Sequence, residues 1–384
     1  WDMKDVAPLF NVPTCVLFAQ ESTDAGSAED VLPVKEWSGK LDERDCPWPV
    51  AKKKLSYQEK TGRVIYLAKR SAFSTSPGAT KPGTSSPYAA HFGQGATIVP
   101  RCFYFVRSHL TFPVDPDGLY WAETDPEQLS LAKKPYDDVH LSGQVEGRFF
   151  YYTVLARHVL PFALLTPSTT VIPLVCDGSK REVWEAPILK RRGYREFGCW
   201  MEEAERIWKQ KRGKKADKVS LYEWLDYQSK LTTQRMSEEH VVLYNSTGTN
   251  VSVASVRRSE FALPLLVEHT VYLGTVTGAD EADYLASVLN SPVSNLAIKP
   301  FQAMGLMGER HIEKKLMDLP IPRFRPEDSR HVALVHLGRE AREKAGRFLK
   351  MSDSPTSLAR QRGWMRDQLR NELTEIDRIV KKLL

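Results

Sequence analysis

The feature that most constrains the fold of this chain is a run of small and turn-forming residues between Ser71 and Pro87. Ser, Thr, Pro and Gly fill thirteen of its seventeen positions. A stretch of this composition buries too little apolar surface to form a core. It predicts a linker over residues 71–92, which separates a first unit, residues 1–70, from everything that follows.

The first unit carries two apolar, strand-like runs, at Asn11–Phe18 and Arg63–Leu67. These runs alternate poorly between apolar and polar residues, so they predict strands buried on both faces, which need a larger sheet to pack against. We therefore expect residues 1–70 to be the trailing strands of a larger α/β domain. The chain begins at Trp1-Asp2 rather than at Met, and from this we expect a fragment of a longer protein.

Residues 93–325 predict a strand-rich domain with an inserted helical stretch. β-branched and aromatic runs bounded by Gly, Pro or Asp favour strands, and a capping box at Ser220 and Glu223 favours a helix that runs to about Leu231. The expected strands are Gly95–Arg107, Arg148–Leu155 and Thr169–Cys176, followed by a helix at Glu196–Gly213, a hairpin within Val241–Val256 and a strand at Leu265–Val276. Alternate members of the aromatic runs Phe103–Phe105 and Phe149–Tyr152 are expected to face the core, while one or two of them could instead stack on bases.

Residues 326–384 predict a helical hairpin. Val332–Leu349 is amphipathic, and from Leu369 to Leu383 apolar residues step by three and four along a coiled-coil-like seam. A break at Ser354–Thr356 separates the two helices, which we expect to be antiparallel. The whole chain is thus predicted to be α+β, with sheet strands first and helices last.

Composition excludes several classes of protein. Apolar residues make up 42% of the chain, enough for real cores, but no apolar run approaches the roughly 20 residues that span a bilayer. The five cysteines form no C-x-x-C pair, which argues against a disulfide framework or a zinc site and favours a reducing cytoplasm. We expect a cytoplasmic protein without membrane contact.

Charge is concentrated in one segment. Residues Lys190–Lys218 hold eleven Lys or Arg against five Asp or Glu, an excess of +6 that equals the charge of the whole chain. Such a patch is typical of nucleic-acid binding, although a solvated helix face would have the same composition. The predicted phosphate contacts are Arg101, Lys190, Arg191, Arg192, Lys209, Lys211, Arg212, Lys214 and Lys215.

A second candidate region is the Gly-rich stretch Phe301–Lys315. Gln and Arg match the edges of adenine and guanine, and Gly305 and Gly308 would let the backbone approach a duplex. Gln302, Arg310 and Lys314 are therefore candidates for base or backbone contact, while an ordinary charged loop is the competing interpretation.

Enzyme motifs are lacking in the sequence. Phosphate-binding loops, a G-x-S-x-G elbow, H-E-x-x-H and metal-like carboxylate spacings are absent from any convincing context. His331 and His336 lie five apart on a helix without a third ligand, so they are expected to be structural or exposed. We predict no catalytic and no metal-binding residues in this chain.

Four segments resemble the C-terminal portion of adenine-N6 DNA methyltransferases of type II, especially combined restriction-modification, systems. The most specific one comprises Tyr284–Pro292, Gln302–Ile312 and Leu319–Pro322, with Val242–Gly248 before it. Gly95–Arg101 is similar to the strand where the recognition region of these enzymes begins, and Trp1–Ala19 to the last strands of their catalytic fold. Leu373–Val380 is similar to their closing helix.

This resemblance implies a function. The family binds S-adenosylmethionine in an N-terminal domain, flips an adenine out of the duplex and methylates it, while the C-terminal region recognises the target sequence. The Asn-Pro-Pro-Tyr motif and the cofactor loop of the family are absent from this chain. We therefore expect a DNA target-recognition part, with S-adenosylmethionine bound by the parent protein only. Its expected partners are double-stranded DNA and the methyltransferase domain. The alternative is an assembly module of a restriction-modification complex that uses the C-terminal helices.

Overall fold

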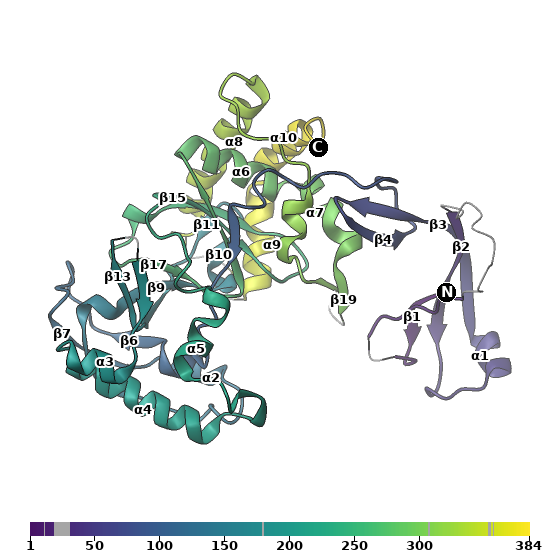
Figure 1. Cartoon of the computed structure of the whole chain (residues 1–384). Coiled ribbons are helices and arrows are strands. Elements are labelled where there is room, and N and C mark those ends of the chain that lie inside the picture. The colour runs from purple at the N-terminus through teal and green to yellow at the C-terminus, as the bar shows by residue number, and fades with distance from the viewer. Residues whose placement is uncertain (11, 19–30, 179, 306–307, 352–354, 356) are drawn as a thin grey trace.

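The computed structural model of the chain (Figure 1) describes residues 1–10, 12–18, 31–178, 180–305, 308–351, 355 and 357–384. It is a mixed α+β structure of several small sheets and a group of C-terminal helices, which confirms the predicted fold class. Within these ranges every helix is too short or too polar to span a lipid bilayer.

The N-terminal part forms a four-stranded sheet at the right of Figure 1, and the end of this sheet contacts the rest of the chain through Leu67 and through the ion pair of Arg70 with Asp318. The strand order is β1-β2-β3-β4, with β1 and β2 parallel and the other pairs antiparallel. Its elements are β1 (Asp2–Ala7), β2 (Val31–Lys40), α1 (Trp48–Lys54), β3 (Leu55–Leu67) and β4 (Arg70–Ser74). The sheet and α1 enclose a small core of their own, formed by Met3, Val6, Trp37, Leu41 and Ala51.

The strand predicted at Asn11–Phe18 is not formed by its described residues. Cys15 makes one isolated bridge to Asp2, Leu17 and Phe18 are exposed, and Asn11 lies outside the described residues. The partner of β1 is instead the more polar strand β2. Whether a segment forms a strand depends on the neighbouring strand with which it can pair, and not only on its own apolar residues. The prediction at Asn11–Phe18 used the apolar residues alone and is therefore wrong.

The Ser/Thr/Pro/Gly-rich run is anchored at both ends. Its first residues belong to β4 and pair with β3. Near its other end, Ser85 Oγ donates to the Asp318 carboxylate at 3.2 Å, and Ser86 Oγ to the Ile321 carbonyl at 3.3 Å. Small residues suffice for β4 because an edge strand needs only its backbone groups for pairing.

The lobe at the lower left of Figure 1 encloses an aromatic core. Phe103, Tyr104, Phe105, Phe149 and Phe150 are buried in it, which confirms the core role predicted for these runs. The lobe contains β6 (Val106–Ser108), β7 (Leu119–Thr124), β8 (Ser142–Glu146), β9 (Phe150–Val154), β12 (Ser168–Val171), β13 (Leu174–Asp177), β14 (Lys180–Val183), α2 (Pro126–Ser130), α3 (Ala186–Arg191), α4 (Arg195–Lys211) and α5 (Leu221–Leu225).

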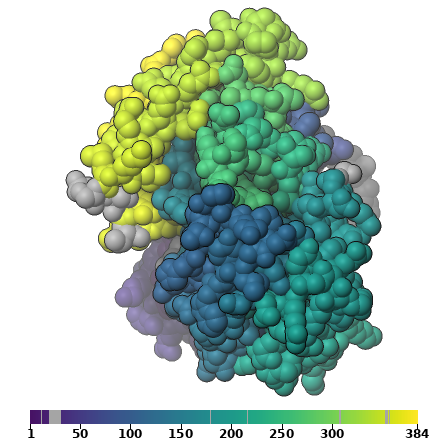
Figure 2. Space-filling model, turned by 90° about the vertical axis from the view of Figure 1, so that its left-hand side faces the viewer, coloured from purple at the N-terminus to yellow at the C-terminus, as the bar shows by residue number. Residues whose placement is uncertain are grey.

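A second lobe packs helices on a four-stranded antiparallel sheet of order β16-β15-β18-β5. The sheet strands are β5 (Phe92–Gln94), β15 (His240–Asn245), β16 (Val253–Arg257) and β18 (Val271–Val276). The other elements are β10 (Val159–Leu160), β11 (Ala163–Leu164), β17 (Leu265–Val267), β19 (Ala303–Gly305), β20 (Gly308–Arg310), α6 (Ala279–Asn290), α7 (Pro292–Ile298), α8 (Ser329–Phe348), α9 (Leu358–Gln368) and α10 (Arg370–Val380). Figure 2 shows these C-terminal helices, in yellow, above the blue and teal lobe, with the purple N-terminal sheet behind both.

Several local predictions are confirmed, but three strand predictions differ from the structure. Thr169–Cys176 is divided between β12 and β13, and Leu265–Val276 between β17 and β18, and Gly95–Arg107 is not one strand. Helix α4, the capping box of α5 and the β15–β16 hairpin lie where the sequence predicts them, although α5 ends at Leu225 rather than near Leu231. Gly95–Arg107 is mostly a buried loop with one 3₁₀ turn, and only its end enters β6. A Cβ on Gly95 would lie 2.3 Å from the Val267 carbonyl oxygen.

The C-terminal region has three helices where the sequence predicted a hairpin of two. α9 and α10 are separated by Leu369, and the break predicted at Ser354–Thr356 falls largely outside the described residues. The apolar seam of α10 packs into the core of the second lobe: Leu369, Leu373, Ile376 and Val380 are all buried. The bounds of the four predicted domains stay a prediction.

Candidate nucleic-acid interface

Helices α3 and α4 carry the basic segment predicted from the sequence. Phe197, Trp200, Met201, Ala204 and Trp208 recur at helical spacing on one side of α4 and are buried. Trp200 Nε1 also donates to the Phe103 carbonyl at 2.9 Å. This face fixes α4 to the lobe, and its charged residues therefore lie on the outside.

Four of the predicted phosphate-binding cations have partners within the chain. These are Lys190 with Glu202 at 2.7 Å, Lys209 with Glu205 at 2.7 Å, Lys211 with Asp138 at 2.6 Å, and Arg212, whose Nη1 donates to the Val219 carbonyl at 3.0 Å. The three lysine pairs are exposed and add little to stability, so these lysines exchange readily for a phosphate. Lys211 also donates to the Pro135 carbonyl, and it ties α4 to the loop after α2.

Five cations of the same segment are exposed and, among the described residues, have no carboxylate within ion-pairing distance. They are Arg191, Arg192, Arg195, Lys214 and Lys218, which we name the free cation set. Arg192 lies over the Trp184 ring, 5.5 Å from its centroid. Arg195 and Lys218 were not among the predicted contacts. Lys215 was, but its side chain lies outside the described residues.

Arg101 has an internal role that the sequence did not reveal. Its Nη2 lies 3.0 Å from Glu268 Oε1, and the Glu268 side chain is fully buried. Burial alone would raise the pKa of Glu268, but the neighbouring His269 and Arg101 lower it to about 2. Arg101 thus neutralises a buried carboxylate, so in this conformation its guanidinium is not free for a phosphate.

Gln302 is also engaged within the chain. Its side chain is buried, and Nε2 donates to the carbonyls of Gly248 at 3.2 Å and Arg310 at 3.3 Å. It pins the β19–β20 hairpin to the loop of residues 246–250. The amide of Gln302 is therefore bonded within the chain rather than available to a base. Arg310 and Lys314, in contrast, are exposed on or beside the hairpin.

The structure does not bring the predicted contacts together. Figure 1 places α3 and α4 at the lower left, whereas the β19–β20 hairpin lies on the other lobe, toward the N-terminal sheet. The free cation set and Arg310 with Lys314 consequently form two separate surfaces. One flat patch that contains all twelve residues is excluded.

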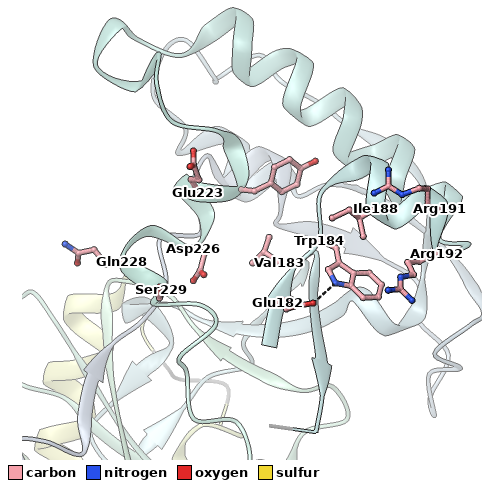
Figure 3. A pocket seen from close by; sticks show the side chains of 11 residues that line it. Glu182, Val183, Trp184, Ile188, Arg191, Arg192, Glu223, Asp226, Gln228 and Ser229 are labelled. Carbon is pink, nitrogen blue, oxygen red and sulfur yellow. Dashed lines mark hydrogen bonds between the residues drawn. The ribbon is translucent and has the colours of Figure 1, made fainter. Parts of the chain in front are cut away.

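A groove beside the free cation set was not predicted (Figure 3). It has a volume of about 820 Å³ and opens between β14, α3 and the turn after α5. Arg191, Arg192 and Trp184 line one side, and Gln228 and Ser229 the other. The lining residues come from three separate stretches of sequence, so no local motif marks it.

Histidine and cysteine chemistry give no second site in the part of the chain that the structure describes. His331 is buried against Tyr284, accepts a hydrogen bond from the Arg325 amide, and has the structural role expected of it. The five cysteines are free thiols. No group of three His, Cys, Asp or Glu among the described residues could hold a metal ion.

Comparison with known proteins gives structural matches but no match to the sequence. No family model and no curated protein matches the sequence. The structure, however, is similar to restriction-modification enzymes of types IIL and IIG over most of the chain. The assignment to an adenine-N6 methyltransferase stays a prediction from the sequence.

Two enzymes represent this class. One is the type IIL restriction-modification enzyme MmeI, whose structure was solved in complex with DNA. The match has a TM-score of 0.49 and 10% identity, and covers 91% of this chain and 38% of MmeI. The other is the type IIG restriction endonuclease BpuSI, with a TM-score of 0.30, 16% identity, and coverage of 62% of this chain and 26% of BpuSI. The chain spans less than half the length of either enzyme.

Proposed function

We propose that this chain binds double-stranded DNA and recognises its sequence, as the target-recognition part of an adenine-N6 DNA methyltransferase of a restriction-modification system. The observation that carries the proposal is the free cation set, five exposed cations without acidic partners on α3, α4 and the turn after α4.

The distribution of ion pairs explains why this patch keeps a net positive charge. Four of the five acids in the basic segment, Glu202, Glu203, Glu205 and Asp217, pair with other cations of that segment. The excess positive charge is therefore carried by the free cation set. A duplex presents one negative charge for roughly every 1.7 Å of its axis, and each neutralised phosphate releases counterions, so such a patch supplies affinity for any sequence.

In this proposal methyl transfer belongs to the parent protein. S-adenosylmethionine and the flipped adenine are assigned to a methyltransferase domain that acts as partner of this chain, and this chain contributes target binding. The second candidate function is an assembly module that docks a partner through the α10 seam. This seam is buried in the second lobe, so it offers no surface to a partner.

Duplex binding measured across a salt series tests the proposal. We expect log Kd to change steeply with log salt for the full chain. The variant R191Q/R195Q/K214Q/K218Q should flatten the slope by up to about 3.6, since each of the four phosphate contacts contributes about 0.9. The control K52Q/K53Q/R347Q/K350Q removes the same charge from exposed, unpaired positions on α1 and at the end of α8.

Three results are informative. A flattened slope for the first variant and an unchanged slope for the control support the proposal. Equal flattening in both variants means that net charge, and not the patch, drives binding, and it overturns the placement of the interface. Absence of binding to any duplex at low salt by the folded wild-type chain overturns the proposed function itself.

A further inference from the structure

The loop of residues 226–235, which follows helix α5, is fastened from its inner side. The Asp226 carboxylate accepts hydrogen bonds from the Leu231 amide at 2.9 Å, and from the amide and hydroxyl of Thr232 at 3.0 and 2.7 Å. Farther along, the buried Gln234 side chain donates to the Val267 carbonyl at 2.8 Å and accepts from its amide at 3.0 Å. The loop is therefore pre-formed.

Two adjacent residues of this loop hold an unfavourable backbone conformation. Gln228 and Ser229 have φ angles of 57° and 55°, in the left-handed region that residues with a side chain rarely adopt. Such strain persists only where the surrounding structure enforces it, and it gathers at functional sites. Asp226 and Gln234, on either side, are the enforcing groups.

The outer side of the loop displays hydrogen-bonding side chains. Tyr227, Gln228, Ser229, Thr233 and Arg235 are all exposed. The Arg235 carbonyl accepts from Arg258 Nη2 at 2.7 Å, which fixes the backbone at the base of that side chain. The loop thus combines a rigid inside with a polar outside, as recognition of a fixed pattern of donors and acceptors requires.

The surroundings of the loop are polar and carry charges of both signs. Arg191 and Arg192 line the groove together with Asp226 and with two further carboxylates, Glu182, which pairs with Lys180, and Glu223, which caps α5. On one side lies the groove of about 820 Å³, where Gln228 and Ser229 are opposite Arg191 and Arg192 (Figure 3). On the other side is a smaller polar cavity of about 140 Å³, lined in part by Thr233 and Arg235. Arg235 Nη1 contacts only the Thr275 hydroxyl, at 3.2 Å, among the described groups, and no carboxylate neutralises it.

We propose that the loop of residues 226–235 is a specificity-determining element that contacts base edges of duplex DNA. Gln228 supplies the paired donor and acceptor that match adenine, and Arg235 the paired donors that match guanine. Arg191 and Arg192, across the groove, contact the adjacent phosphates and set the register of the duplex. This inference rests on the proposed function, because it requires that the chain binds DNA.

Selection of duplexes from a randomised pool tests the inference, with the full chain as wild type and as the variants Q228G and R235Q. Glycine suits a positive φ, so Q228G removes the side chain without disturbing the loop. Each variant should lose about tenfold or more of the preference for one base pair of the selected motif, at different positions. S229G is the backbone-matched control, and R347Q the control for loss of an exposed Arg.

The outcomes separate this inference from the proposed function. A motif that relaxes at one position in each variant, but not in the controls, supports it. An unchanged motif in both variants, or equal relaxation in S229G and Q228G, overturns base recognition by these side chains while DNA binding stands. Retention of DNA without any motif overturns it as well. No retention by the wild type removes the proposed function and the inference with it.

Discussion

Arg101 and Glu268 are separated by 167 positions in the sequence, yet Arg101 Nη2 lies 3.0 Å from Glu268 Oε1. The carboxylate is buried between the two lobes' strands and is also contacted by His269 Nδ1 at 2.8 Å and the Thr270 hydroxyl at 2.6 Å. A buried charge of this kind is tolerable only when its partners remain. The pair therefore ties the loop before β6 to the turn between β17 and β18.

Removal of the Arg101 charge should destabilise the fold. We expect R101Q to lower the free energy of unfolding by about 3 kcal/mol, because it leaves the buried Glu268 carboxylate without its arginine partner. Urea denaturation measures the change, and R107Q, at an exposed Arg without a described partner, is the control. The double variant R101Q/E268Q should recover part of the loss. A R101Q protein as stable as R107Q would contradict this role.

His158 should make the protein less stable below neutral pH. Burial, aided by the charges of Arg157 and Arg101, lowers its pKa from 6.5 to about 3, and its Nδ1 accepts the Leu155 amide at 3.0 Å. As the pH falls through 6.5, His158 therefore takes up a proton in the unfolded chain but stays neutral in the folded protein. Stability should fall by about 1.4 kcal/mol per pH unit from this group, down to the folded pKa.

Denaturation between pH 6.5 and 5 checks this expectation, since that window lies above the ordinary pKa of carboxylates such as Glu268. H158Q, whose side-chain oxygen can accept the same amide, should show a flatter dependence on pH. H336Q, at an exposed position on α8, should keep the wild-type slope. A slope that is identical in H158Q and wild type would exclude His158 as the source.

The local elements were predictable from the sequence because their signals are local. The apolar spacing of α4, the Ser220–Glu223 capping box and the turn between β15 and β16 depend on neighbours within a few residues. Which cations have a partner was only partly predictable. Arg191, Arg192 and Lys214 were named from the sequence, but the carboxylate that pairs with Lys211 is Asp138, 73 positions away. The loop of residues 226–235 was missed for the same reason. Its conformation depends on Gln234 binding Val267, 33 positions on.

The α10 seam should behave as part of the core. We expect I376A to lower the free energy of unfolding by about 3 kcal/mol, because a buried Ile loses its contacts and leaves a cavity. N371A, on the exposed face of the same helix, should change stability by less than about 0.5 kcal/mol. Sedimentation should give the same oligomeric state for both variants. A changed oligomeric state with unchanged stability would restore the assembly-module interpretation.

Gln302 should act on the β19–β20 hairpin rather than on DNA bases. Its Nε2 bonds to the Gly248 and Arg310 carbonyls, and the loss of these bonds in Q302A should cost about 1 kcal/mol. Amide hydrogen exchange should become faster in the hairpin strands, where opening no longer breaks these bonds. The motif selected from a randomised duplex pool should stay the same. R310Q is the matched test of an exposed side chain on the same hairpin, and it should leave hydrogen exchange unchanged. If Q302A instead altered one position of the motif at wild-type exchange rates, Gln302 would be a base contact, as its residue type alone predicts.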